Sequence, residues 1–182
     1  MKLNWIAALL LLGACNSADD QSASQEAQVA THQVFLVRHA EKQSGENPSL
    51  TEAGAQRAET LAGLLSEAGI THIHSTDYKR TLETAAPLAA QTGIEITLYD
   101  PRDLEAFANE LRAAHGVHLV VGHSNTTPQL AEALGGTPGS DIDEASEYDR
   151  LYVVSLSASG VSSEIQRYGV RYEASELTDV TE

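Results

Sequence analysis

The sequence predicts an α/β fold, a three-layer α/β/α sandwich with a mostly parallel sheet. Short apolar runs typical of buried strands alternate with segments of helical apolar spacing from residue 33 onward. The chain has 182 residues, without an internal repeat or a second domain in the pattern. We therefore expect one folded domain over residues 33–173, followed by a loose tail over residues 174–182.

The first elements follow from local patterns. Residues 34–37, Val-Phe-Leu-Val, are apolar at every position, which predicts a strand buried on both faces. Ser49-x-x-Glu52 resembles a capping box, so a helix should follow and end at Gly69. Its apolar residues fall on one face. They are Ala58, Leu61, Ala62 and Leu65.

The second half of the chain continues the alternation. Further strands are predicted at residues 71–76, 94–98 and 117–121. Residues 77–91 should form a helix with a kink or irregular turn at Pro87. Its inward residues should be Leu82, Ala85, Ala86 and Ala89. Another helix carries Leu104 to Leu111, and Pro128 is suited to open the next, which runs to about Leu134. After an acidic loop, residues 151–156 and 161–168 predict a final pair of strands across a turn.

The N-terminus has the pattern of a targeting segment. Lys2 precedes a short apolar stretch at residues 5–12, and Cys15, the only cysteine, follows small residues. This resembles a bacterial lipobox, with residues 1–14 as signal peptide, lipidation at Cys15 and residues 15–32 as a flexible linker. The alternative is an ordinary secretory signal. We expect a lipid-anchored protein of the bacterial envelope, and Asn16 after the cysteine resembles sorting to the outer membrane, facing the periplasm.

The formal net charge is −15. Such an acidic surface repels nucleic acid and anionic membrane faces, so we expect no nucleic-acid partner and membrane contact only through the lipid anchor. Any anion site must be a local focus of positive charge. The composition therefore favours a small phosphorylated metabolite or a phosphorylated side chain as substrate.

Residues that could bind a phosphoryl group lie where predicted strands end. Arg38 and His39 follow the first strand, His123 follows the fourth, and Arg80 opens the helix after the second. Ligands bind at the carboxyl ends of parallel strands, so these side chains should meet at one edge of the sheet. Arginine offers forked donors to phosphoryl oxygens, and a neutral imidazole can attack phosphorus. This set predicts phosphoryl transfer.

Four motifs in this order carry a resemblance to a family. They are Val37-Arg38-His39-Ala40, Leu50-Thr51-x-x-Gly54-x-x-Arg57-Ala58, Thr76-x-x-x-Arg80-x-x-x-Thr84-Ala85 and Val121-Gly122-His123-Ser124. Together they resemble the histidine phosphatase superfamily, whose fold is phosphoglycerate mutase-like. The resemblance covers residues 33 to about 156. The compact length resembles small phosphohistidine or phosphoprotein phosphatases more than sugar-phosphate mutases.

The resemblance implies a role for each residue. His39 would be the nucleophile that forms a phosphohistidine, while Arg38, Arg80 and His123 would hold the phosphoryl oxygens. No metal or organic cofactor is implied. Two residues could add to the substrate site, namely Ser124 and Arg57, although a solvated helix arginine is an equal reading of the latter.

This chain departs from the family pattern at the positions of the proton donor. Larger members carry a glutamate after the third strand, in a segment without a match here, and the acid-phosphatase branch has an aspartate where this chain has Ser124. Asp100 is the nearest candidate donor, and a strand-end cap is the competing reading.

Several residues have simpler readings. His72 and His74 share one face of a strand and could bind a metal, but no third ligand is evident. His115 and His118 are expected at the surface. Residues 147–149 are expected to form a solvated acidic loop, with a place at the rim of the pocket as the alternative. A serine hydrolase is disfavoured because no G-x-S-x-G motif surrounds Ser124.

The function predicted is hydrolysis of a phosphomonoester or phosphoramidate through a phosphohistidine on His39. One alternative is a lipoprotein that keeps the phosphate pocket and binds without turnover. A phosphomutase is the other.

Overall fold

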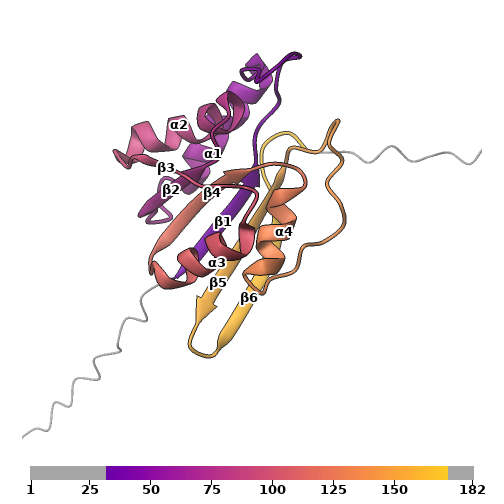
Figure 1. The fold of residues 1–182 in the computed structure, drawn as a ribbon. Coiled ribbons are helices and arrows are strands. Elements are labelled where there is room, and N and C mark those ends of the chain that lie inside the picture. Colours follow the sequence, from indigo (N-terminus) through magenta and orange to yellow (C-terminus); the bar gives the residue numbers. More distant parts are fainter. Residues whose placement is uncertain (1–31, 172–182) are drawn as a thin grey trace, which may run out of the picture.

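The computed structural model describes residues 32–171, and it has the predicted α/β architecture (Figure 1). The signal-peptide, Cys15 and tail predictions lie outside these residues. Four helices and a six-stranded sheet follow one another along the described chain. The strands are β1 (Gln33–Arg38), β2 (His72–Ser75), β3 (Ile96–Leu98), β4 (Val117–Gly122), β5 (Arg150–Ser157) and β6 (Gly160–Arg167). The helices are α1 (Glu52–Leu65), α2 (Lys79–Thr92), α3 (Leu104–Ala113) and α4 (Thr126–Ala133).

The sheet is mixed and mostly parallel. Its strand order is β3-β2-β4-β1-β5-β6. The four strands β1 to β4 pair in parallel, whereas β5 runs antiparallel to both of its neighbours, β1 and β6. The carboxyl ends of the parallel strands therefore meet at one edge, with Arg38 of β1 in register with Gly122 of β4.

Alternate residues of the central strands pack into two separate cores, one on each face of the sheet. Phe35 and Val37 of β1 face the core formed with α1 and α2, and Val34 and Leu36 face the core formed with α3 and α4. Figure 1 shows the α1–α2 pair and the α3–α4 pair as separate groups about the sheet. Among the described residues, no helix is long and apolar enough to cross a bilayer.

Two helix starts differ from the prediction. The side chain of Thr51, not Ser49, caps α1 by accepting a hydrogen bond from the backbone N–H of Gly54. Helix α4 begins at Thr126, two residues before Pro128, because a proline is tolerated anywhere in the first turn, where the backbone N–H groups have no helical acceptor.

The inward face of α2 also differs. The helix continues through Pro87 as one element. Ala86, expected inside, is exposed, whereas Thr81, Thr84 and Leu88 are buried. The threonines have hydrogen-bond partners within the fold, which permits their burial beside the sheet edge.

Candidate active site

The four predicted phosphoryl-binding residues converge at the carboxyl edge of the sheet. The imidazole centroids of His39 and His123 are 5.7 Å apart. Nη2 of Arg80 lies 3.4 Å from Nδ1 of His123. Arg38 ends β1 directly before His39. These residues are distant in the sequence, and they meet because β1, β2 and β4 are consecutive in the sheet.

His39 is held in the tautomer that a nucleophile requires. The ring is 3% exposed, and its Nδ1 lies 2.8 Å from the carbonyl oxygen of Ala40. A carbonyl oxygen only accepts, so Nδ1 carries the proton and Nε2 keeps its lone pair. Burial lowers the pKa of His39 to about 3, and the positive charges of Arg38 and Arg80 act in the same direction. The imidazole is therefore neutral at ordinary pH.

Arg38 connects the end of β1, next to His39, to the loop before β5. Its side chain is 1% exposed, and its Nη groups donate to the backbone carbonyls of Asp143, Glu144 and Glu147 over 2.9–3.1 Å. The guanidinium carbon lies 4.1 Å from the centroid of the Tyr148 ring. These contacts fix the plane of the guanidinium next to His39.

Two guanidinium N–H groups remain without a partner. Nε of Arg38 and Nε of Arg80 are both buried and have no hydrogen-bond acceptor among the described residues. A buried unpaired donor on a charged group is costly unless an anion completes it. Both donors therefore point to an anion site beside His39.

His123 is also fixed in one tautomer. Arginine only donates, so Nδ1 of His123 accepts from Arg80, and Nε2 then donates to Oγ1 of Thr76 at 3.0 Å. Thr76 in turn donates to Thr81. Burial lowers the pKa of His123 to about 4, with the charges of Arg80 and Arg38 contributing. Thr76 holds the ring orientation of His123.

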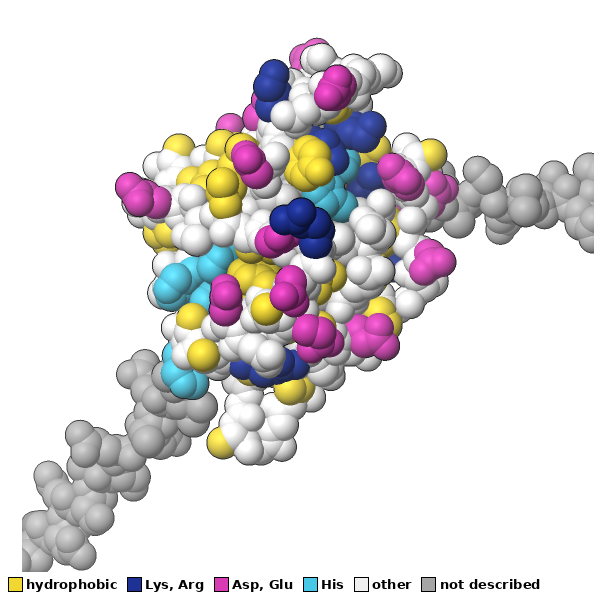
Figure 2. Space-filling view, in the orientation of Figure 1, with side chains coloured by type: hydrophobic (Ala, Val, Ile, Leu, Met, Phe, Trp, Pro, Cys, Tyr) yellow, Lys and Arg dark blue, Asp and Glu magenta, His cyan; other side chains and the backbone are white. Residues whose placement is uncertain are grey.

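His39, Arg80 and His123 line a cavity of about 610 Å³. Cationic and polar neighbours form the rest of its wall. The neighbours are Lys42, Tyr78, Pro101, Arg102, Ser124, Asn125, Thr126 and Glu144. Figure 2 shows Lys or Arg side chains next to histidine in one part of a surface otherwise rich in acidic side chains. The positive charge is thus local, as the net charge required.

Arg57 does not belong to this cavity. Its guanidinium is 7% exposed and donates to the carboxylate of Glu41, with Nη2 to Oε1 at 2.8 Å, and to the carbonyls of Tyr168 and Val170. Neither the substrate-binding nor the solvated reading is therefore correct. Arg57 ties the segment after β6 to helix α1.

Asp100 is not among the residues that line the cavity. Its carboxylate is exposed and pairs with Arg102, Oδ2 to Nη2 at 2.6 Å. The hydrogen bonds from Arg102 lower the pKa of Asp100 to about 2. A proton donor requires the opposite shift, so this geometry does not support Asp100 as the acid.

The segment 147–149 is not a solvated loop. Glu147 and Asp149 are buried and form ion pairs with Arg167, and Glu147 also pairs with Arg150. Tyr148 between them lies against the rings and guanidinium of the site, 6.2 Å from the His39 centroid. Tyr148 therefore agrees with the alternative of a pocket rim, whereas the burial of Glu147 and Asp149 could not be predicted locally because their partner arginines lie on β5 and β6.

A group of histidines gathers at the opposite edge of the sheet, where the parallel strands begin. His118, expected at the surface, is fully buried, and its Nδ1 lies 3.1 Å from Nε2 of His74. The rings of His72 and His118 stack at 4.5 Å rather than pointing toward a common centre. No cluster of three or more suitable ligands that could hold a metal ion occurs within residues 32–171.

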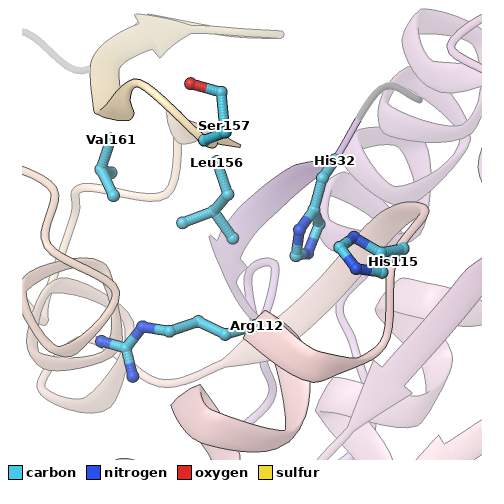
Figure 3. Close-up of a pocket in the computed structure, with 7 residues that line it drawn as sticks. His32, Arg112, His115, Leu156, Ser157 and Val161 are labelled. Atoms are coloured by element: carbon cyan, nitrogen blue, oxygen red, sulfur yellow. The ribbon is translucent and has the colours of Figure 1, made fainter. Parts of the chain in front are cut away.

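A separate cavity of about 510 Å³ also lies at that edge (Figure 3). His32, Arg112 and His115 line one part of it, and Leu156 and Val161 of the β5–β6 hairpin line another. None of the residues predicted to bind the phosphoryl group takes part.

Residues 34–101 match the family model of the histidine phosphatase superfamily (branch 1). The probable phosphoglycerate mutase GpmB of Photorhabdus laumondii is 34% identical over 129 residues, which cover 66% of this chain and 58% of the relative. GpmB of Escherichia coli K12 is 35% identical over 127 residues, covering 65% and 57%. The chain thus spans less than three fifths of the length of these curated relatives.

Solved structures share the fold. SixA from Agrobacterium tumefaciens superposes with a TM-score of 0.59 at 20% identity, over 77% of this chain and 99% of SixA. The protein histidine phosphatase SixA complexed with tungstate gives 0.59 at 18% identity, over 75% and 95%. The mycobacterial glucosyl-3-phosphoglycerate phosphatase gives 0.58 at 13% identity, over 76% and 98%.

Proposed function

We propose that this chain is a histidine phosphatase that works through a phosphohistidine on His39, and the match of residues 34–101 to the model of the histidine phosphatase superfamily supports this. The observation that carries the proposal is the pair of unpartnered guanidinium donors, Nε of Arg38 and Nε of Arg80, beside an imidazole whose Nε2 is unprotonated. A phosphoryl group satisfies both donors and presents phosphorus to the nucleophile.

The chemistry proceeds in two steps. Nε2 of His39 attacks phosphorus, so the P–N bond forms while the bond from phosphorus to the leaving group breaks. Water then attacks the phosphohistidine, and the electron pair of the P–N bond returns to Nε2. Arg38 and Arg80 stabilise the charge on the phosphoryl oxygens in both transition states, and His123 positions Arg80 through the hydrogen bond that its Nδ1 accepts.

The substrate is a phosphomonoester or phosphoramidate, carried on a small metabolite or on a protein side chain. The similar fold of the protein histidine phosphatase SixA supports a phosphoramidate. The GpmB relatives favour a second candidate, a phosphomutase. A mutase would return the phosphoryl group to a second position of the same substrate, and a phosphatase would release it to water.

The test is release of p-nitrophenolate from p-nitrophenyl phosphate by the wild type and by His39→Ala. We expect the variant to lose activity by a factor on the order of a thousand or more, since nothing else in the site can replace Nε2. His115→Ala is the matched control, because His115 is exposed at the opposite edge of the sheet. Equal rates for wild type and His39→Ala would refute the proposal.

Inactivity of the wild type on a panel of phosphorylated metabolites and phosphopeptides, together with vanadate binding, would instead support the binding protein that lacks turnover. Phosphoryl exchange between two positions of a sugar phosphate would support the mutase.

We also propose that the domain is anchored by lipid at Cys15 to the bacterial envelope, at the outer membrane facing the periplasm. The sequence pattern around Cys15 supports this. Mass spectrometry of the mature N-terminus measures it, and a free Cys15 thiol in the native protein would contradict it.

A further inference from the structure

The proton that the leaving group needs has no source among the residues that bind the phosphoryl group. Arg38 and Arg80 hold their protons too tightly to release them at neutral pH. The proton on the neutral His39 ring is committed to the Ala40 carbonyl, and the proton on the neutral His123 ring is committed to Thr76. An ester oxygen leaves as an alkoxide unless an acid protonates it. A proton donor is therefore required between the phosphoryl group and the leaving group.

A second cavity adjoins the catalytic cavity and has room for a leaving group. This cavity, of about 500 Å³, is formed by helix α4 and the loop before β5. Its wall shares three residues with the wall of the catalytic cavity, namely Ser124, Asn125 and Glu144. A substrate with its phosphoryl group at His39 can extend past these residues into the second cavity.

Only one of the three shared residues has a side chain that can donate a proton to the leaving group, namely Glu144. A serine hydroxyl and an asparagine amide do not transfer protons readily near neutral pH, whereas a carboxyl group does. Glu144 is also the one carboxylate among the residues that line the catalytic cavity. Its carboxylate forms no hydrogen bond or ion pair with any residue in the described range 32–171.

The other nearby carboxylates have partners. Glu41 pairs with Arg57, Asp100 pairs with Arg102, and Asp103 caps helix α3 through the backbone N–H of Ala106. These carboxylates are occupied by contacts within the fold, so Glu144 remains the candidate proton donor.

The backbone of Glu144 is fixed to the phosphate clamp. Nη2 of Arg38 donates to its carbonyl at 3.1 Å, and the same guanidinium holds the carbonyls of Asp143 and Glu147 on either side. The carboxylate of Glu147 accepts from the backbone N–H of Asp143, which closes the turn. The side chain of Glu144 therefore extends from a turn that Arg38 positions relative to His39.

We propose that Glu144 is the acid and base of the reaction, a role that rests on the proposed phosphatase function. As phosphorus is transferred to His39, the Glu144 carboxyl gives its proton to the leaving oxygen and becomes a carboxylate. In the second step that carboxylate takes a proton from the attacking water as the P–N bond breaks. The cycle consumes one water and restores both groups.

The test compares two substrates of nearly the same shape, phenyl phosphate and p-nitrophenyl phosphate, in the full chain. Nitrophenolate leaves without a proton, whereas phenolate is far more basic. We expect Glu144→Gln to lower kcat/KM for phenyl phosphate by about tenfold to a hundredfold. The pre-steady-state burst of p-nitrophenolate should stay within about threefold of wild type. Steady turnover should fall, and phosphohistidine should accumulate on His39, visible by mass spectrometry.

Two further variants complete the experiment. Glu144→Asp keeps the carboxyl and should recover part of the phenyl phosphate activity. Glu59→Gln makes the same change at an exposed carboxylate of helix α1, outside both cavities, and should behave as wild type.

The outcomes separate the two proposals. Equal losses on both substrates, including the burst, would overturn the role of Glu144 in proton transfer, and so would unchanged kinetics in Glu144→Gln. Either result leaves the phosphatase function standing if the wild type turns over. A wild type without turnover and without phosphohistidine would overturn the proposed function, and the role of Glu144 with it.

Discussion

Acidification should destabilise this protein through the histidines at the edge of the sheet opposite the candidate site. His74 and His118 lie between β2, β4 and helix α3, where Nε2 of His118 donates to the carbonyl oxygen of Ala114 at 2.6 Å. Its Nδ1 therefore accepts from Nε2 of His74. Protonating His118 would place two N–H groups against each other. Burial, together with the neighbouring histidines, lowers the pKa of both histidines to about 4.

The sign and size of this loss of stability follow from the linkage between proton binding and folding. In the unfolded chain a histidine has a pKa of about 6.5, so between pH 6.5 and pH 4 the unfolded state binds more protons than the folded state. The stability that the neutral pair contributes is present above pH 6.5 and is lost as the pH falls toward 4. From pH 7 to pH 5 each histidine costs about 2 kcal/mol, or about 3 to 4 kcal/mol for the pair.

The assay is urea unfolding of the purified protein at pH 7 and pH 5, in wild type and in His74→Phe with His118→Gln. The glutamine keeps a donor for the Ala114 carbonyl. The double variant should be less stable at pH 7, yet its loss between pH 7 and pH 5 should be smaller than that of wild type by about 3 kcal/mol. His115→Gln, an exposed histidine, should keep the wild-type pH dependence. A double variant with the full wild-type loss would refute the reasoning.

Two further predictions concern the candidate site and helix α1. Thr76→Val removes the acceptor that orients His123 and should lower kcat about tenfold, the effect of one hydrogen bond of about 1.4 kcal/mol, whereas Thr76→Ser should restore it. Steady-state kinetics on p-nitrophenyl phosphate measure this, and a kcat in Thr76→Val equal to wild type would contradict it. Gly54→Ala would push a Cβ into the backbone carbonyl of Glu41 and should cost about 2 kcal/mol or more of unfolding free energy. Gly63→Ala, in open space on the same helix, should instead add about 0.5–1 kcal/mol, and equal effects of the two in urea unfolding would argue against the close contact.

The alternation of strands and helices was readable from the sequence because each element carries its own local pattern. The apolar run at residues 34–37 of β1 indicated a strand covered on both faces, and the two cores on either side of the sheet confirm this. Element boundaries were less accurate. The cap of α1 depends on which hydroxyl reaches the N–H of Gly54, and Thr51 and Ser49 look equivalent in one dimension.

The sequence by itself determined the set of candidate phosphoryl-binding residues. Arg38, His39, Arg80 and His123 stand at strand ends and helix starts in the order of known motifs. The carboxyl ends of parallel strands lie at the same edge of the sheet, so these residues meet there. The tertiary structure decided the tautomers, because these depend on which acceptor each imidazole nitrogen faces. It also decided that Arg57 is buried away from the cavity and that Glu144 enters it. Both outcomes depend on contacts between segments distant in the chain, and local sequence patterns do not predict such contacts.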